Sequence, residues 1–489
     1  MKALTAIVKL TLRNAIRSHV FQLLLGFLIL CVALIPTTVG GSTAMDFIRV
    51  SLLYSLSGVG TILSLSALWV GCQVMSADID SYQLHMVVSK PVSRVTIWFG
   101  KFLGVLILHF VLLAVAAAAI YCVVLWRFNH GNFPEEERAR IRREVLVGRR
   151  VFLPERPEYE KQALEALGEK IRKRQADGKS VDLSEKAQER EYKDCLKEAI
   201  ARDSEVEPAL YEVKLDDGRT VKMLSESKYR EWKYKGVPHD TEKPIYLRFR
   251  PYVGKVKSEE QRNTAVGLGI EIPRFLPGSK EAEGASADES RFMADFYNSV
   301  LMSGEFHEVP LKGNVGIVSS KGEVRIRVRN LDPKMATQFY QPADGPKLLI
   351  EVTGFLGNYV RAILVIALQL TMMALLSCAL GGFLTLPTAV FVSMSYLTFG
   401  FMTSYLTDPE FYVNGVMDQT GQKISWWILD HYLIVPLERF DVTDLVAGGE
   451  LVEWSLIFNR LCMLGPMLPL VLLGILLYRR REIGLVIRK

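Results

Sequence analysis

Long apolar runs separated by polar segments occupy both ends of this chain and predict membrane-spanning helices. A helix needs about 20 apolar residues to cross the hydrocarbon core of a bilayer. Residues 362–406 carry no charged side chain over 45 positions, and Gly381, Gly382 and Pro387 favour a turn that divides this run into two helices. The six predicted spans are 20–39, 52–75, 102–126, two helices within 362–406, and 461–478.

The first 17 residues predict a helix that lies on the membrane surface. Apolar positions recur with helical spacing and basic positions fall on other faces, a pattern typical of interfacial helices. The apolar positions are Leu4, Ile7, Val8 and Leu12, and the basic positions are Lys9, Arg13 and Arg17. The alternative is that these basic residues simply flank the first span, without a mechanical role.

The segment between the third and fourth spans has a different composition. Of the 59 Lys and Arg residues and the 53 Asp and Glu residues of the chain, residues 127–355 carry 42 and 40. So many balanced charges predict a soluble domain, because a bilayer does not accept them. The fold class that follows is an α-helical polytopic membrane protein with an inserted α+β domain that contains a β-sandwich-like part.

Within the insert, the periodicity changes from helical to alternating. Residues 133–205 predict two exposed helices, and residues 244–354 predict strands, with a hairpin between 315–318 and 323–329 and a polar loop at 254–290. The predicted helices are 158–175 and 183–201, and the other predicted strands are 245–250 and 347–353. A second outer segment, 407–460, is rich in aromatic residues and predicts short amphipathic helices at 440–447 and 451–458.

The short loops determine the predicted orientation. With a cytoplasmic N-terminus, the short inside segments hold twelve basic and three acidic residues, whereas the short outside segments hold five basic residues. Cytoplasmic loops are enriched in Lys and Arg, and long domains cross the membrane regardless of their charge. Both termini are therefore predicted to be cytoplasmic, and residues 127–355 extracytoplasmic.

The sequence predicts no catalytic residue, no cofactor and no metal site. Five of the six cysteines lie in apolar runs, so Cys195 cannot form a disulfide within the insert. Glu305, His307 and Glu308 lack a spaced partner that would complete a metal site, which favours a solvated loop. His109 lies within the third span without an acidic partner at comparable depth, which favours a neutral, hydrogen-bonded histidine over a proton relay.

Segment 76–101, between the second and third spans, is the most informative part of the chain. Asp78 and Asp80 are expected at the N-terminal end of a short helix, where carboxylates complement the helix dipole. An apolar surface too short to span a membrane follows, and a proline ends it. Arg94 and Lys101 then frame the start of the next span, with Trp98 at headgroup depth. An apolar surface exposed to the cytoplasm is costly unless a partner or the bilayer covers it. The residues alone therefore leave a docking element and an ordinary interfacial loop equally open.

The run Val-Val-Ser-Lys-Pro-Val-Ser-Arg at 87–94, followed by Gly-Lys-Phe-Leu-Gly at 100–104, resembles the same region of ABC-2 type transporter permeases. Ser81-Tyr82 departs from the Gly-Thr of many members of that family. The resemblance covers the six spans, about half of the chain, and implies that this loop contacts a separate ATPase. The implied contact residues are Asp78, Asp80, Tyr82, Leu84, Met86, Pro91, Arg94, Gly100 and Lys101.

The chain has no nucleotide-binding loop of its own. Gly178-Lys179-Ser180 is the only approximate match, and position 173 is Lys where the motif requires Gly. ATP would therefore be used by a partner subunit. The resemblance further implies cytoplasmic ABC ATPases, a second permease copy or paralogue, membrane lipid and no nucleic acid as the partner set. It implies export of an unknown substrate across the cytoplasmic membrane of a bacterium.

Three regions follow from these predictions: 1–126 with loop 76–101, the extracytoplasmic insert 127–355, and 356–489 with outer loop 407–460. Two other functions stay open. A non-transporting sensor or anchor would use its external domain to bind a partner. An ion-coupled transporter is disfavoured, because charged side chains are nearly absent from the spans.

Overall fold

The computed structural model describes residues 2–38, 40, 43–80, 92–176, 185–214, 219–225, 227–238, 243–253, 265–273, 294–311, 316–332, 334–341, 344–406 and 437–480. The chain forms two compact units. The helical unit is Met1–Gly148 with Val352–Lys489, and the β-rich unit is Arg149–Glu351. Residues 127–148 therefore belong to the helical unit, whereas the sequence analysis assigned them to the insert.

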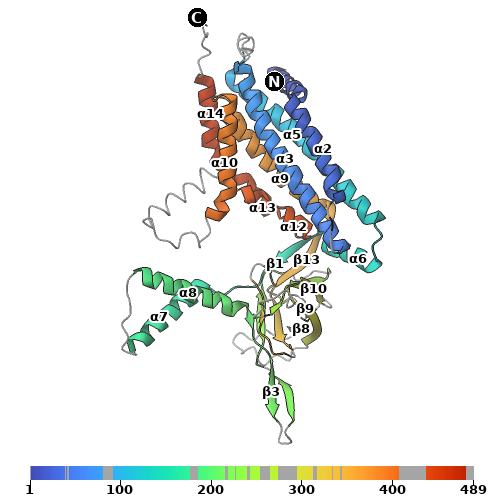
Figure 1. The fold of residues 1–489 in the computed structure, drawn as a ribbon, viewed down its shortest axis with the longest axis vertical. Helices are drawn as coiled ribbons and strands as arrows, with labels where there is room; N and C mark the ends of the chain where they lie inside the picture. Colours follow the sequence, from blue (N-terminus) through green and yellow to red (C-terminus); the bar gives the residue numbers. More distant parts are fainter. Residues whose placement is uncertain are drawn as a thin grey trace. The chain divides into compact units, whose positions relative to one another are not determined.

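The described part of the helical unit consists of helices of very different lengths (Figure 1). Its α-helices are α1 (Lys2–Arg17), α2 (His19–Thr38), α3 (Ala44–Asp80), α5 (Arg94–His130), α6 (Glu135–Glu144), α9 (Phe355–Gly381), α10 (Leu386–Leu406), α12 (Thr443–Ala447), α13 (Trp454–Cys462) and α14 (Leu468–Arg480). Two 3₁₀ helices, η4 (Leu437–Phe440) and η5 (Gly465–Met467), lie between them. The break after α9 falls where the glycine pair and Pro387 predicted it.

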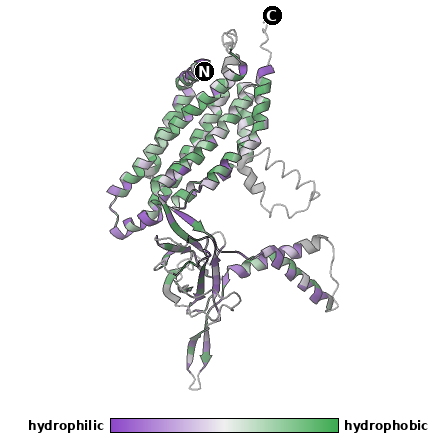
Figure 2. Cartoon of the chain, turned by 180° about the vertical axis from the view of Figure 1, so that it is seen from behind, coloured by the Kyte–Doolittle hydropathy of each residue, from purple (hydrophilic) through white to green (hydrophobic). Residues whose placement is uncertain are grey.

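Four helical segments among the described residues are long and apolar enough to cross a membrane. They are Ala44–Ser76, Arg94–His130, Phe355–Gly381 and Trp454–Arg480. A further candidate is a broken span made of α1 and Phe21–Ile35, which meet at 70°, and Leu386–Phe399 is apolar but shorter. Figure 2 shows hydrophobic residues along these helices. The chain is thus a membrane protein with four clear candidate spans among the described residues, and the count of six stays a prediction.

Small residues allow α3 and α9 to approach closely. Gly71 lies against Ser377, and a Cβ atom on Gly381 would lie 2.9 Å from the Cα atom of Cys72. The hydroxyl of Ser377 donates to the carbonyl oxygen of Ala67 across the same contact, at 3.2 Å. Close packing and interhelical hydrogen bonds hold helices together in lipid, where the hydrophobic effect offers little.

The β-rich unit contains α7 (Tyr159–Ala176), α8 (Glu185–Ser204) and antiparallel sheets. Its strands are β1 (Val147–Phe152), β2 (Glu205–Val206), β3 (Leu210–Lys214), β4 (Thr220–Leu224), β5 (Arg230–Tyr234), β6 (Ile245–Phe249), β7 (Tyr252–Val253), β8 (Ala265–Pro273), β9 (Ala294–Met302), β10 (His307–Leu311), β11 (Val324–Asn330), β12 (Gln338–Phe339) and β13 (Lys347–Gly354). Two four-stranded sheets have the orders β1-β13-β6-β10 and β5-β11-β8-β9. Residues of both, such as Leu247 and Ile326, are fully buried in one shared core.

Two expectations for the strands were wrong. Strand β8 lies inside the predicted polar loop 254–290, because its apolar residues alternate at positions 266, 268, 270 and 272. Strand β11 pairs with β5 and β8, and residues 316–318 form a turn rather than its hairpin partner. The tight turn before β11 does exist, since Gly322 has φ +74° and its amide donates to the Ser319 carbonyl. The parts of the loop at 254–264 and 274–290 lie outside the described residues.

Candidate functional site

The structure assigns the acidic pair of the predicted docking segment to a different element. Helix α3 continues through Asp80, so Asp78 and Asp80 lie in its last turn and not at the start of a new helix. The sequence Ser76–Asp80 contains no Gly or Pro to end α3 sooner. The dipole argument for these carboxylates is therefore wrong, because the C-terminal end of a helix favours cations. Tyr82, Leu84, Met86 and Pro91 lie outside the described residues.

Within segment 76–101, helix α5 begins at Arg94, and a side chain caps its N-terminus. The Ser93 hydroxyl caps α5 by accepting a hydrogen bond from the Thr96 amide at 3.2 Å. Serine is a favoured N-cap because its oxygen satisfies one of the free amides of the first turn. From the first residue of α5, the Arg94 guanidinium donates to the carbonyl oxygen of Arg479 on α14 at 2.8 Å. The start of α5 is thus bonded to the last helix described in the chain.

Two side chains of the first turns of α5 are buried against other helices. Lys101 is only 4 % exposed, and its ammonium donates to the Val74 carbonyl oxygen of α3 at 2.8 Å. Trp98 is fully buried, and its indole nitrogen donates to the Cys378 carbonyl oxygen of α9 at 3.3 Å, while its headgroup depth stays a prediction. Both side chains can pack against other helices because α5 begins at Arg94, eight residues before the predicted span.

Glycines bring α1 onto the start of α5. A Cβ atom on Gly100 would lie 2.7 Å from Ile7, and one on Gly104 would lie 2.7 Å from Thr11. The Gly-x-x-x-Gly spacing is a sequence signal for close helix contact that could have revealed this packing. The helix α1 itself was predicted correctly, and it leaves Leu10 and Ile16 about half exposed. Together, α1, α3 and α14 surround the base of the predicted docking segment.

Substitution of Gly104 by leucine is expected to release α1 from α5. Overpacking a close contact costs about 1–3 kcal/mol, and about 1.4 kcal/mol corresponds to a factor of ten in an equilibrium. Tryptic cleavage within α1 should therefore accelerate about tenfold or more relative to the unchanged protein. The matched control is Gly26→Leu on α2, where an added Cβ meets nothing within 4 Å. Equal cleavage rates for both variants would contradict the packing role of Gly104.

The histidine of the third predicted span is satisfied by hydrogen bonds. His109 is 1 % exposed, with Nδ1 at 2.8 Å from the Val105 carbonyl oxygen and Nε2 at 3.1 Å from the Ser66 hydroxyl of α3. This arrangement confirms the interpretation of a hydrogen-bonded histidine at a helix interface.

In the β-rich unit, His307 contacts the Met302 carbonyl oxygen and Glu308 forms an ion pair with Arg149. These two side chains lie on strand β10 and have structural partners, so the expected solvated loop was wrong for them.

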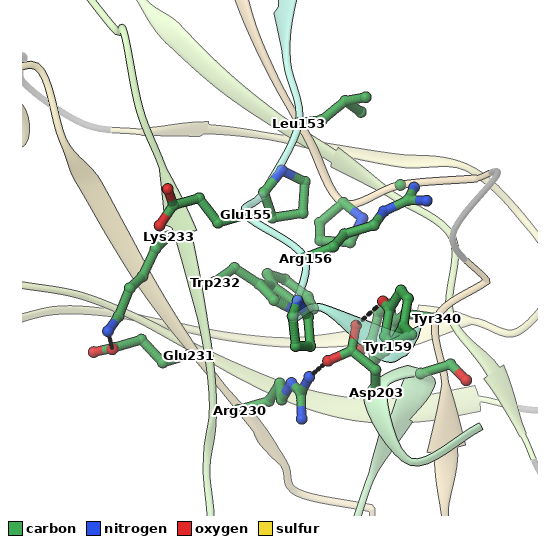
Figure 3. A pocket seen from close by; sticks show the side chains of 15 residues that line it. Leu153, Glu155, Arg156, Tyr159, Asp203, Arg230, Glu231, Trp232, Lys233 and Tyr340 are labelled. Carbon is green, nitrogen blue, oxygen red and sulfur yellow. Dashed lines mark hydrogen bonds and ion pairs between the residues drawn. The ribbon is translucent and has the colours of Figure 1, made fainter. Parts of the chain in front are cut away.

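A pocket of about 370 Å³ opens in the β-rich unit (Figure 3). It lies between the extended segment 153–157, the end of α8, strand β5, Tyr340 and the pair Gly345-Pro346. The phenol of Tyr159 donates to Asp203 at 2.5 Å, and Arg230 forms an ion pair with the same carboxylate. Burial lowers the pKa of Arg230, while Tyr159 acts in the opposite direction. No local sequence signal indicates this site, because its residues come from four separate segments.

The described residues contain no group of three or more His, Cys, Asp and Glu side chains that could hold a metal ion. Hydrogen bonds join the start of α5 to α3 and α14, and the pocket has the volume of a small-molecule site. No family model, no curated protein and no solved structure matches this chain.

Proposed function

We propose that this chain is the permease subunit of an ABC-2 type transporter, driven by a separate ATPase that docks on segment 76–101. The observation that carries the proposal is the anchoring of that segment. One end continues α3, and the other starts α5. The contacts of Arg94 with α14 and of Lys101 with α3 connect the same point to two more positions in the bundle. A push on the segment would therefore reach several helices at once.

The proposed mechanism follows from this connection. ATP binding in the partner would displace the segment between α3 and α5, tilt these helices, and open a path beside a second permease copy or paralogue. In this proposal α2 and α10 also cross the membrane, which gives six spans with both termini in the cytoplasm. The β-rich unit would then lie outside the cytoplasmic membrane of a bacterium. The pattern of short basic loops supports this orientation, and the resemblance supports export.

The test is the purification of the affinity-tagged full chain from its own host in a mild detergent. We expect an ABC ATPase to co-purify and to hydrolyse ATP. Charge reversal by Asp80→Lys or Arg94→Glu should reduce the amount of bound ATPase about tenfold or more, since like charges at an interface cost several kcal/mol. The matched control is Lys222→Glu, an exposed charge reversal on β4 of the β-rich unit.

A complex without any ATPase would overturn the proposal and favour a sensor or anchor. Unchanged ATPase recovery in both reversal variants would remove the docking role of the segment. Thermal melting of each variant distinguishes loss of docking from loss of folding. A melting temperature equal to that of the control, combined with lost ATPase, supports the proposal.

A further inference from the structure

The pocket of the β-rich unit has an unusual balance of charge. Three acidic residues, Glu155, Asp203 and Glu231, and three basic residues line it. Every acid is already paired: Asp203 with Arg230, Glu155 with Lys235 at 2.5 Å, and Glu231 with Lys233 at 3.4 Å. The lining is therefore close to neutral in sum, although it is strongly polar.

This pairing disfavours a charged ligand. An anion or a cation in the pocket would compete with an existing ion pair, and a partly buried charge that loses its partner is costly. A hydroxyl group, by contrast, both donates and accepts hydrogen bonds. It can accept from Arg230 and donate to Asp203 without separating a pair. The chemistry of the lining thus favours a neutral ligand with many hydroxyl groups.

The remaining surface of the pocket is apolar and partly aromatic. Trp232 and Tyr340 form its inner wall, with ring centroids 5.2 Å apart and ring planes at 74° (Figure 3). Leu153 and the rings of Pro154 and Pro157 line the other side. Pockets that bind small molecules combine such apolar walls with a few polar groups that fix orientation. A sugar ring presents both kinds of surface, since its C–H groups are apolar and its edge carries hydroxyls.

We propose that this pocket binds a neutral saccharide of one or two rings. Asp203 accepts hydrogen bonds from its hydroxyls, Arg230 donates to them, and the wall near Trp232 contacts the ring. A volume of about 370 Å³ lies at the lower end of the range typical of small-molecule sites, about 300–1,000 Å³. The proposal does not rest on the transport function, because it concerns only residues of the β-rich unit.

The experiment uses the full-length protein in lipid nanodiscs, without detergents that carry a sugar headgroup. Binding of glucose, maltose, cellobiose and N,N′-diacetylchitobiose is measured by isothermal titration calorimetry and by saturation-transfer NMR. We expect at least one of them to bind with a Kd of about 1 mM or lower. Glucuronate and glucosamine serve as charged counterparts of glucose, and both should bind more weakly than the neutral sugar.

Two variants at leucines of similar exposure test whether the saccharide binds in this pocket. Leu153→Trp should fill the pocket and weaken binding about tenfold or more, a loss of about 1.4 kcal/mol. Leu164→Trp introduces the same side chain at a leucine of α7 with similar exposure, 59 % against 53 %, outside the pocket, and it should bind as the unchanged protein does. Asp203→Asn should also weaken binding about tenfold, because a hydrogen bond to a charged group is replaced by a weaker one.

Two results would overturn the proposal. The first is the absence of saturable binding for all four neutral sugars at concentrations up to about 50 mM, or stronger binding of glucuronate or glucosamine than of glucose. The second is saccharide binding that Leu153→Trp and Leu164→Trp leave equally unchanged. Loss of ATPase association does not affect either measurement, so the two proposals fail separately.

Discussion

Arg149→Met is expected to destabilise the β-rich unit by about 3–5 kcal/mol, because it leaves a buried carboxylate without its charged partner. The Arg149 Nη1 atom lies 2.6 Å from the Glu308 Oε1 atom, and the two side chains are 1 % and 5 % exposed. The free energy of unfolding can be measured by pulse proteolysis in urea on the full-length protein. A change of this size exceeds the usual effect of a surface substitution severalfold.

The double variant Arg149→Met with Glu308→Leu should recover most of the loss, since an apolar pair of similar volume often replaces a buried ion pair without cost. The neighbouring Arg150→Met is the matched control, because Arg150 is exposed on the same strand. If the single variant unfolds at the same urea concentration as this control, the ion pair contributes nothing to stability.

Asn358→Leu is expected to destabilise the helical unit by about 2–5 kcal/mol. The fully buried Asn358 amide donates to the Glu450 carbonyl oxygen at 2.8 Å and accepts from the Val452 amide at 2.8 Å. Leucine makes neither bond, and each buried backbone group left unsatisfied costs about 1–3 kcal/mol. The thermal unfolding temperature of the protein in lipid nanodiscs should fall accordingly.

Asn459→Leu provides the matched control, because Asn459 is exposed on α13. This variant should melt within one or two degrees of the unchanged protein, as most surface substitutions do. A similar fall for both asparagine variants would mean that polarity in general, and not the bonds of Asn358, maintains the segment between α12 and α13.

Most of the helices could be predicted from the sequence because their signals are local. The run 20–39 corresponds to α2, and the predicted helices 158–175 and 183–201 correspond to α7 and α8 within a few residues. Membrane spans are especially easy to predict, since lipid requires every backbone polar group to be hydrogen-bonded within the helix. The interruption of the last span, by contrast, was not predicted. The helix there breaks into α13, η5 and α14 around Gly465–Met467, where a proline lies in the apolar run.

The strand pairing could not be predicted because it depends on distant segments. β11 and β5 are nearly one hundred residues apart, and the pair Arg327↔Glu231 is set by the sheet rather than by a turn. The alternation of β8 was visible in the sequence, but the charged flanks obscured it. Alternation identifies the face of a strand and does not identify its neighbour.

For segment 76–101, the sequence by itself determined a short polar connection between two apolar helices, because hydropathy and charge are properties of consecutive residues. Only the tertiary structure decided what surrounds that connection. Asp80 is the last residue of α3, and the buried Lys101 ammonium donates to the Val74 carbonyl oxygen. Helix α1 packs closely against Gly100 and Gly104. The physical reason is that burial and hydrogen bonding join groups far apart in the chain, such as the Arg94 side chain and the Arg479 main-chain carbonyl oxygen, whose contact no local pattern records.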